Sequence, residues 1–107
     1  MPRKKHVIDI AFRHALIGTW IHPDEAHVEY TVSSIGDVCE VSGIDKSDGE
    51  RFVITNVVWD GRELKFNSLC PSSQHRLKHT FRVISDTEVE HEWTCVESWF
   101  KMKNPSR

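Results

Sequence analysis

The stretch that decides the fold is FVITNVVWDGRELKF, residues 52–66. Its first half, 52–59, is the part of the chain richest in β-branched and aromatic residues, which favour strands. Asp60-Gly61 follows it, a dipeptide typical of the tight turn between two antiparallel strands. A two-residue turn here predicts an inner face made by the pairs Val57–Leu64, Thr55–Phe66 and Val53–Ser68.

Shorter runs of alternating character continue on both sides of this hairpin. We expect further strands over 18–22, 28–35, 38–44, 75–84 and 88–100, with turns at 23–24, 36–37, 45–49, 71–73 and 85–87. The last run is too long for one ordinary strand, so a bend or bulge is expected near 95–97. Apolar residues at helical spacing over 8–16 predict a short helix before the first strand.

The connections between these runs are too short for parallel crossovers, which need a dozen residues or more. The sequence therefore predicts an all-β fold, an antiparallel up-and-down meander of seven or eight strands with a short N-terminal helix. A meander of that size leaves two unpaired edges unless it curls. We expect a curled sheet or a small barrel, whose interior is either filled or holds one small ligand.

Length and composition limit the alternatives. The 107 residues allow one domain, 1–107, of which 1–7 are expected to be a disordered basic tail. The net charge of -2 produces no positive electrostatic potential that would attract nucleic acid. No apolar run approaches the roughly 20 residues that span a bilayer. Three cysteines without a CxxC spacing, and an N-terminus without an export signal, favour a cytoplasmic protein with reduced thiols.

One short motif carries a family resemblance. Leu16-Ile17-Gly18-Thr19-Trp20 resembles the Gly-x-Trp start of lipocalin-like (calycin) barrels, in which a short helix leads into the first strand and the Trp plugs the barrel end. The hairpin 57–66 is similar to that of bacterial lipocalin-like domains of unassigned function. The resemblance implies a small β-barrel domain and carries over no ligand. The chain is shorter than a typical lipocalin and lacks its late helix and its disulfide pairing.

A three-residue turn over 85–87 sets the register of the last two strands. It keeps apolar residues on one face, whereas a two-residue turn would mix the core face with the solvent face. The pairs that it predicts are His79–Trp93, Phe81–His91, Leu77–Cys95 and His75–Glu97. His79, His91 and Cys95 then point inward as neighbours on one face.

These inward residues predict a pocket that binds a small, partly apolar molecule. Its aromatic walls are expected from Trp20, Tyr30, Trp59, Phe66, Phe81 and Trp93, and its polar contacts from His79, His91, Cys95 and Glu97. Imidazole and thiolate could also bind a metal, but no ligand-spacing motif supports a metal or another cofactor. Alternatively, the same histidines are core residues whose ring nitrogens are satisfied by hydrogen bonds.

Two further functions stay open at this stage. The residues predicted to face outward are apolar, and they could form a homodimer or be covered by the N-terminal helix; they are Phe52, Ile54, Val58 and Leu69. The other possibility is a hydrolase or isomerase that uses His79 or His91 with Glu97. No phosphate loop or nucleophile elbow accompanies these residues, so the sequence favours binding over catalysis.

Overall fold

The computed structural model describes residues 14–35 and 38–102, and this part of the chain is built from β-strands. The strands are β1 (Gly18–His22), β2 (Glu25–Ile35), β3 (Val38–Asp45), β4 (Glu50–Arg51), β5 (Val53–Trp59), β6 (Glu63–Cys70), β7 (His75–Val83) and β8 (Val89–Val96). They form two four-stranded antiparallel sheets, in the orders β1-β2-β3-β4 and β5-β6-β7-β8. The predicted all-β class is confirmed.

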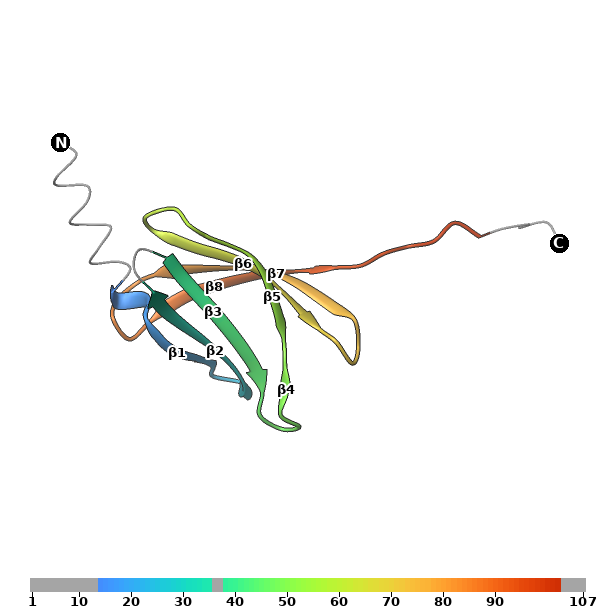
Figure 1. Ribbon diagram of the computed structural model, residues 1–107, viewed down its shortest axis with the longest axis horizontal. Coiled ribbons are helices and arrows are strands. Elements are labelled where there is room, and N and C mark those ends of the chain that lie inside the picture. Colours follow the sequence, from blue (N-terminus) through green and yellow to red (C-terminus); the bar gives the residue numbers. More distant parts are fainter. Residues whose placement is uncertain (1–13, 36–37, 103–107) are drawn as a thin grey trace.

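The two sheets meet at the segment 50–59. Only Phe52 separates β4 from β5, and its N–H donates to the carbonyl of Gly43 at 3.0 Å. The chain therefore leaves the first sheet and enters the second without a loop, as Figure 1 shows where β3, β4 and β5 come together. The strands form two sheets in place of one continuous curled sheet, and no ladder in the described residues joins β1 to β8 to close a barrel.

The predicted register of the β5–β6 hairpin is wrong. Val53 pairs with Leu69 and Ile54 with Ser68, and the ladder shifts between Thr55 and Val58. Asn56 lies in this irregularity with a φ of 55°, a left-handed conformation that asparagine tolerates better than most residues. Beyond it, the last pair before the turn is Trp59–Leu64.

The turn itself explains the first part of this error. Asp60 is the last residue before the turn, since its N–H donates to the carbonyl of Glu63 at 3.1 Å. Its carboxylate accepts the N–H groups of Arg62 and Glu63, at 3.0 and 2.8 Å. The tight turn is therefore at Gly61-Arg62, one residue later than predicted, with Gly61 at a φ of 100°.

The corrected register changes which residues face outward. Phe52 and Ile54, predicted to be outward, pack against the core together with Val57 and Trp59. Val53, predicted to be inward, is exposed, and Val58 is exposed as predicted. Leu69 is half-buried opposite Val53. The apolar outer patch is thus smaller than expected.

The predicted register of the last hairpin is confirmed over the length of β8. The pairs include His79–Trp93, Phe81–His91 and Leu77–Cys95. The N–H groups of Ile84 and Ser85 both donate to the carbonyl of Glu88 and close the turn. The strand ends at Val96, so the expected bend at 95–97 is a strand end, and Glu97 lies outside the ladder.

Ser98 Oγ accepts a hydrogen bond from Arg76 of β7 at 2.7 Å, and the chain beyond it continues away from both sheets (Figure 1). Trp99 and Phe100 are 89% and 91% exposed, and Met102 is also exposed. At the other end, His14–Leu16 are helical, and Trp20 donates its indole N–H to the carbonyl of Leu16 at 2.7 Å. The rest of the predicted helix, the basic tail and the turn at 36–37 lie outside the described residues.

The core lies between the two sheets. Its buried members are Leu16, Tyr30, Val32, Cys39, Leu64, Phe66, Phe81 and Val83. Tyr30 lies opposite Gly43 in the β2–β3 ladder, and a Cβ atom at Gly43 would lie 2.7 Å from the Tyr30 ring and 2.8 Å from the Phe52 ring. The missing side chain at Gly43 is what lets both rings pack across β3.

The substitution Gly43→Ala tests this packing. We expect it to lower the free energy of unfolding by about 1–3 kcal/mol, because the new methyl group must displace two rings. A glycine replaced inside an unobstructed strand would instead gain stability. Urea denaturation measures the change. The control is Ser42→Ala at the exposed neighbouring position, expected to stay within about 0.5 kcal/mol of the parent; equal stability of the two variants would contradict this account.

Candidate functional site

Both sheets contribute polar side chains to the space between them. β2 supplies Tyr30, β6 supplies Ser68, β7 supplies His79 and β8 supplies His91. The β6–β7 ladder sets Phe66 opposite His79, and the β7–β8 ladder sets Phe81 opposite His91. Since side chains alternate along a strand, the two ladders bring these residues to one face of the second sheet.

These four polar residues form a chain of hydrogen bonds. The Tyr30 hydroxyl donates to Ser68 Oγ at 3.4 Å and lies 3.3 Å from His79 Nε2. Ser68 Oγ is 2.7 Å from the same nitrogen. The other nitrogen of that ring, His79 Nδ1, is 2.9 Å from His91 Nε2. Ser68 and His79 are buried, so a hydrogen bond missing here would leave a costly unpaired polar group.

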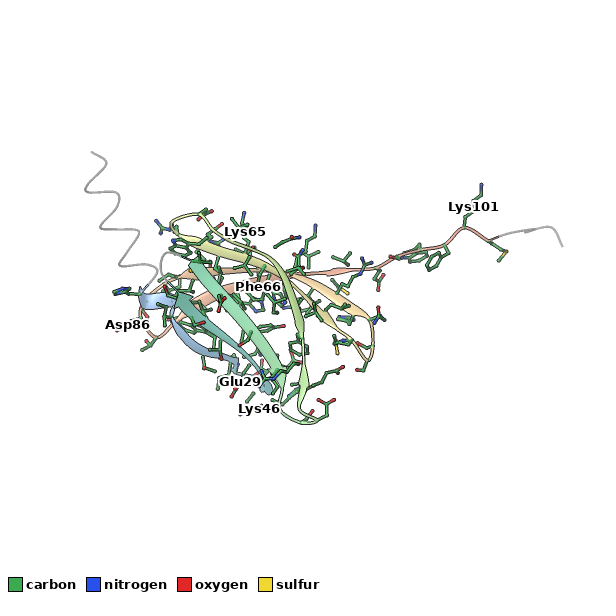
Figure 2. The ribbon with its side chains drawn as sticks, in the orientation of Figure 1. Glu29, Lys46, Lys65, Phe66, Asp86 and Lys101 are labelled. Atoms are coloured by element: carbon green, nitrogen blue, oxygen red, sulfur yellow. The ribbon has the colours of Figure 1, made fainter. Side chains whose placement is uncertain are left out.

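Aromatic rings hold the two imidazoles in place. Phe66, labelled between the sheets in Figure 2, stacks on His79 with ring centroids 4.7 Å apart and planes at 19°. The His79 and His91 rings are nearly parallel at 13°, and their centroids are 5.1 Å apart. With their facing nitrogens at 2.9 Å, the rings lie edge to edge, in line with their hydrogen bond. Phe81 meets His91 edge-on at 89°.

Burial keeps this group uncharged. Desolvation, together with the neighbouring His91, lowers the pKa of His79 from 6.5 to about 4. Desolvation also lowers the pKa of His91, and His22 adds to the effect. Burial raises the pKa of Tyr30. All three side chains are therefore neutral at neutral pH, and each ring nitrogen of the two histidines is either a donor or an acceptor.

Two adjoining cavities open beside this group. The first, called the cup, has a volume of about 320 Å³ and is bordered by Phe52, Ser68, Leu77, His79 and Trp93 among others. The second, called the side cavity, has about 290 Å³ and is bordered by Trp20, Phe81 and Val89 among others. Four residues border both cavities: His22, Val28, Tyr30 and His91. His91 thus lies where the two cavities meet, and its partner His79 borders the cup alone.

The structure brings together part of the predicted site. Tyr30, Phe66, His79, Phe81 and His91 form one cluster of ring contacts. Trp20 borders the side cavity, and Trp93 borders the cup and is 56% exposed.

The other predicted site residues lie elsewhere. Trp59 packs against the core and borders neither cavity. Cys95 is exposed, with its Sγ 3.6 Å from His75 Nε2, because the sheet ends there. Glu97 borders neither the cup nor the side cavity, since it follows the end of β8.

Sequence reasoning missed Ser68 as a site residue. The β5–β6 pattern already placed it on the inner face, but its partner His79 comes from the next hairpin. The register across the Pro71–Gln74 connection was needed to see the contact. His75–Cys70 pairing in the β6–β7 ladder fixes that register, and it sets Ser68 opposite Leu77, next to His79.

The geometry and the pKa give opposite indications for catalysis by Ser68 and His79. Ser68 Oγ and His79 Nε2 are within the distance of a nucleophile and its general base. However, a base with a pKa of about 4 takes up a proton poorly at neutral pH, where an effective base has a pKa close to the working pH.

The described residues contain no group of three His, Cys, Asp or Glu side chains placed to hold a metal ion, and no helix long and apolar enough to cross a membrane.

The neutral histidine pair predicts a loss of stability in mild acid. The folded pKa of His79 lies below its unfolded value of 6.5, so below about pH 6.5 the unfolded chain binds a proton that the folded protein does not. Between about pH 7 and pH 5, His79 alone should lower the free energy of unfolding by about 2 kcal/mol. Urea denaturation at both pH values measures this difference.

Two variants identify the source of this pH dependence. His79→Gln removes the titrating group and should show a smaller difference between the two pH values than the parent protein. His27→Gln replaces an exposed histidine of β2 and should keep the parent's pH dependence. The explanation fails if both variants show the same pH dependence.

The chain matches no protein-family model, and comparisons with curated proteins and with solved structures gave no match either. No relative therefore supplies a ligand, a partner or a reaction for this site.

Proposed function

We propose that this protein is a lipocalin-like binding domain that holds a small, partly apolar molecule in the cup between its sheets. The observation that carries the proposal is an apolar cavity of about 320 Å³ whose wall contains the buried His79 hydrogen-bonded to the half-buried His91. Pockets for small molecules are concave, mostly apolar and equipped with a few fixed polar groups, and their volumes begin at roughly 300 Å³.

The walls of the cup support this proposal. Phe52 comes from the junction of the two sheets and Trp93 from the edge strand β8, and they offer aromatic surface. Tyr30 adds a third ring, held by its hydrogen bonds to Ser68 and His79. A site whose rings and polar groups are already ordered loses little conformational entropy when a ligand binds.

The resemblance at Gly18-Thr19-Trp20 agrees with this proposal but does not carry it. Trp20 packs against the core and borders the side cavity, and its indole is fixed by the hydrogen bond to Leu16. The position suits a side chain that closes one end of a ligand-binding space. A binding domain of this kind needs neither a closed barrel nor a catalytic residue.

Filling the cup tests the proposal. Val28 is half-buried and borders both cavities, so Val28→Trp should occupy much of the space that a ligand would use. N-phenyl-1-naphthylamine is an uncharged aromatic probe whose fluorescence rises in apolar surroundings. We expect the parent protein to bind it and the variant to bind it at least about tenfold more weakly.

The matched control is Val58→Trp, which adds the same side chain at an exposed position of β5. This variant should bind the probe like the parent. Urea denaturation of both variants separates a filled cup from a damaged fold. Absence of probe binding by the parent, or equal binding by both variants, would contradict the proposed site.

A second candidate is an interaction module that forms a homodimer. The observation that favours it is the exposed aromatic pair Trp99 and Phe100, which follows β8, an edge strand of the second sheet in the described residues. Large exposed apolar side chains beside an open sheet edge are typical of contact surfaces between protein chains.

Native mass spectrometry tests the dimer. The homodimer predicts a species of twice the chain mass, and it predicts that the double variant Trp99→Ser, Phe100→Ser shifts the protein to the single-chain mass. Probe binding in the cup should be unchanged in the variant. A parent protein that stays at the single-chain mass at every concentration refutes the dimer and leaves the binding proposal intact.

A further inference from the structure

The direction of the hydrogen-bond chain fixes which nitrogens of the histidine pair carry protons. The Tyr30 hydroxyl donates to Ser68 Oγ, so the proton of Ser68 is left to donate to His79 Nε2. If His79 Nε2 instead donated to Ser68, the Ser68 proton would have no acceptor in a buried position among the described residues. His79 Nε2 is therefore an acceptor.

The same logic continues to His91. A neutral His79 whose Nε2 is an acceptor carries its proton on Nδ1, and this N–H donates to His91 Nε2. His91 is neutral as well, so its own proton is on Nδ1. The chain that begins at the Tyr30 hydroxyl thus ends in the Nδ1–H group of His91.

This terminal donor is accessible. In the described part of the chain, Nδ1 of His91 has no hydrogen-bond partner, while every fully buried side-chain nitrogen and oxygen has one. The atom is therefore in contact with open space. His91 borders the cup and the side cavity, and these two cavities are the open space beside its ring.

The charges around this region limit what can bind. The described residues that border the two cavities include no lysine or arginine, whereas Glu25, Asp45 and Glu88 do border them. Hydrogen bonds from Ser47 lower the pKa of Asp45 further, so this carboxylate is ionised at neutral pH. A carboxylate or phosphate would lose its hydration here without gaining a permanent positive partner.

We propose that the cup takes an uncharged, compact, largely aromatic molecule whose carbonyl oxygen or aza nitrogen accepts a hydrogen bond from His91 Nδ1–H. This inference rests on the proposed binding function and names the chemical class of its ligand. The aromatic walls supply contact area, and the single fixed donor supplies orientation. Fatty acids and other anions should bind more weakly, because no lysine or arginine of the described residues borders either cavity.

Three probes of similar size separate these contributions. Acetophenone has an aromatic ring and a carbonyl acceptor, ethylbenzene has the ring without the acceptor, and benzoate has the ring with a negative charge. Binding of each is followed by shifts of backbone amide signals in the NMR spectrum of the whole chain. We expect acetophenone to bind about 3- to 10-fold more tightly than ethylbenzene, the effect of one neutral hydrogen bond, and benzoate to bind most weakly.

The variant His91→Phe removes the donor and keeps a flat ring. It should bind acetophenone and ethylbenzene with equal affinity, whereas His27→Phe, at an exposed position, should keep the preference. The nitrogen spectrum of the imidazoles provides a check that needs no variant, because it distinguishes the two neutral forms of histidine. Both His79 and His91 are expected to carry the proton on Nδ1.

The outcomes distinguish the two proposals. Equal binding of acetophenone and ethylbenzene by the parent, tightest binding of benzoate, or a proton on Nε2 of His91 overturns the ligand class while leaving the binding function intact. Absence of binding by all three probes overturns the binding function and the ligand class together. If His91→Phe does not fold, the affinity ratio of the parent and the proton positions still decide.

Discussion

The contact of Tyr30 with Ser68 and His79 is the interaction on which the interior depends. It joins a residue of the first sheet to two residues of the second, at 3.4 and 3.3 Å, in a place where none of the three side chains could turn to bulk water instead. Gly43 makes room for the Tyr30 ring, and Phe66 and Phe81 surround the imidazole partners. Apolar packing around a satisfied polar chain strengthens each of its hydrogen bonds, because the local dielectric is low.

Hydrogen bonds on the outer surfaces fix the strand positions on which the interior contacts depend. Arg82 of β7 donates to Glu63, Glu90 and Glu92 at 2.6, 2.6 and 3.0 Å, and so links β6, β7 and β8 on the face opposite the histidines. Glu50 accepts hydrogen bonds from Cys70 and Ser72, which ties β4 to the connection after β6. Isolated exposed ion pairs contribute little stability, but a shared cation that fixes three strands restricts their register as well. These contacts therefore keep the strands that border the cup in fixed positions relative to one another.

The sequence was sufficient where local turn chemistry and alternation agree. The three-residue turn at 85–87 has one register that keeps apolar residues together, and from it followed the positions of His79, His91 and Trp93. The sequence was insufficient at Asn56. A bulge there shifts the strand register by one residue, and no glycine or proline in the sequence marks its position. The error moved Phe52 and Ile54 to the wrong face.

Glu97 was assigned to the site because nothing in a run of strand-forming residues shows where its partner strand begins. The contact between Ser68 and His79 joins two hairpins, and the contact with Tyr30 joins two sheets; neither distance follows from local patterns.

The segment 50–59 belongs to both sheets, since β4 and β5 are separated by a single residue whose backbone still bonds to β3. Two hairpin-built sheets connected by a flexible loop could melt one after the other. Here, unfolding of the first sheet disrupts β4, which continues directly into β5, the edge strand of the second sheet. Unfolding of the second sheet in turn removes the hydrogen bond and packing contacts that the segment 50–59 makes with β3. The continuous segment 50–59 therefore couples the two sheets, and we expect them to unfold in one transition, reported alike by tryptophan fluorescence and by backbone circular dichroism.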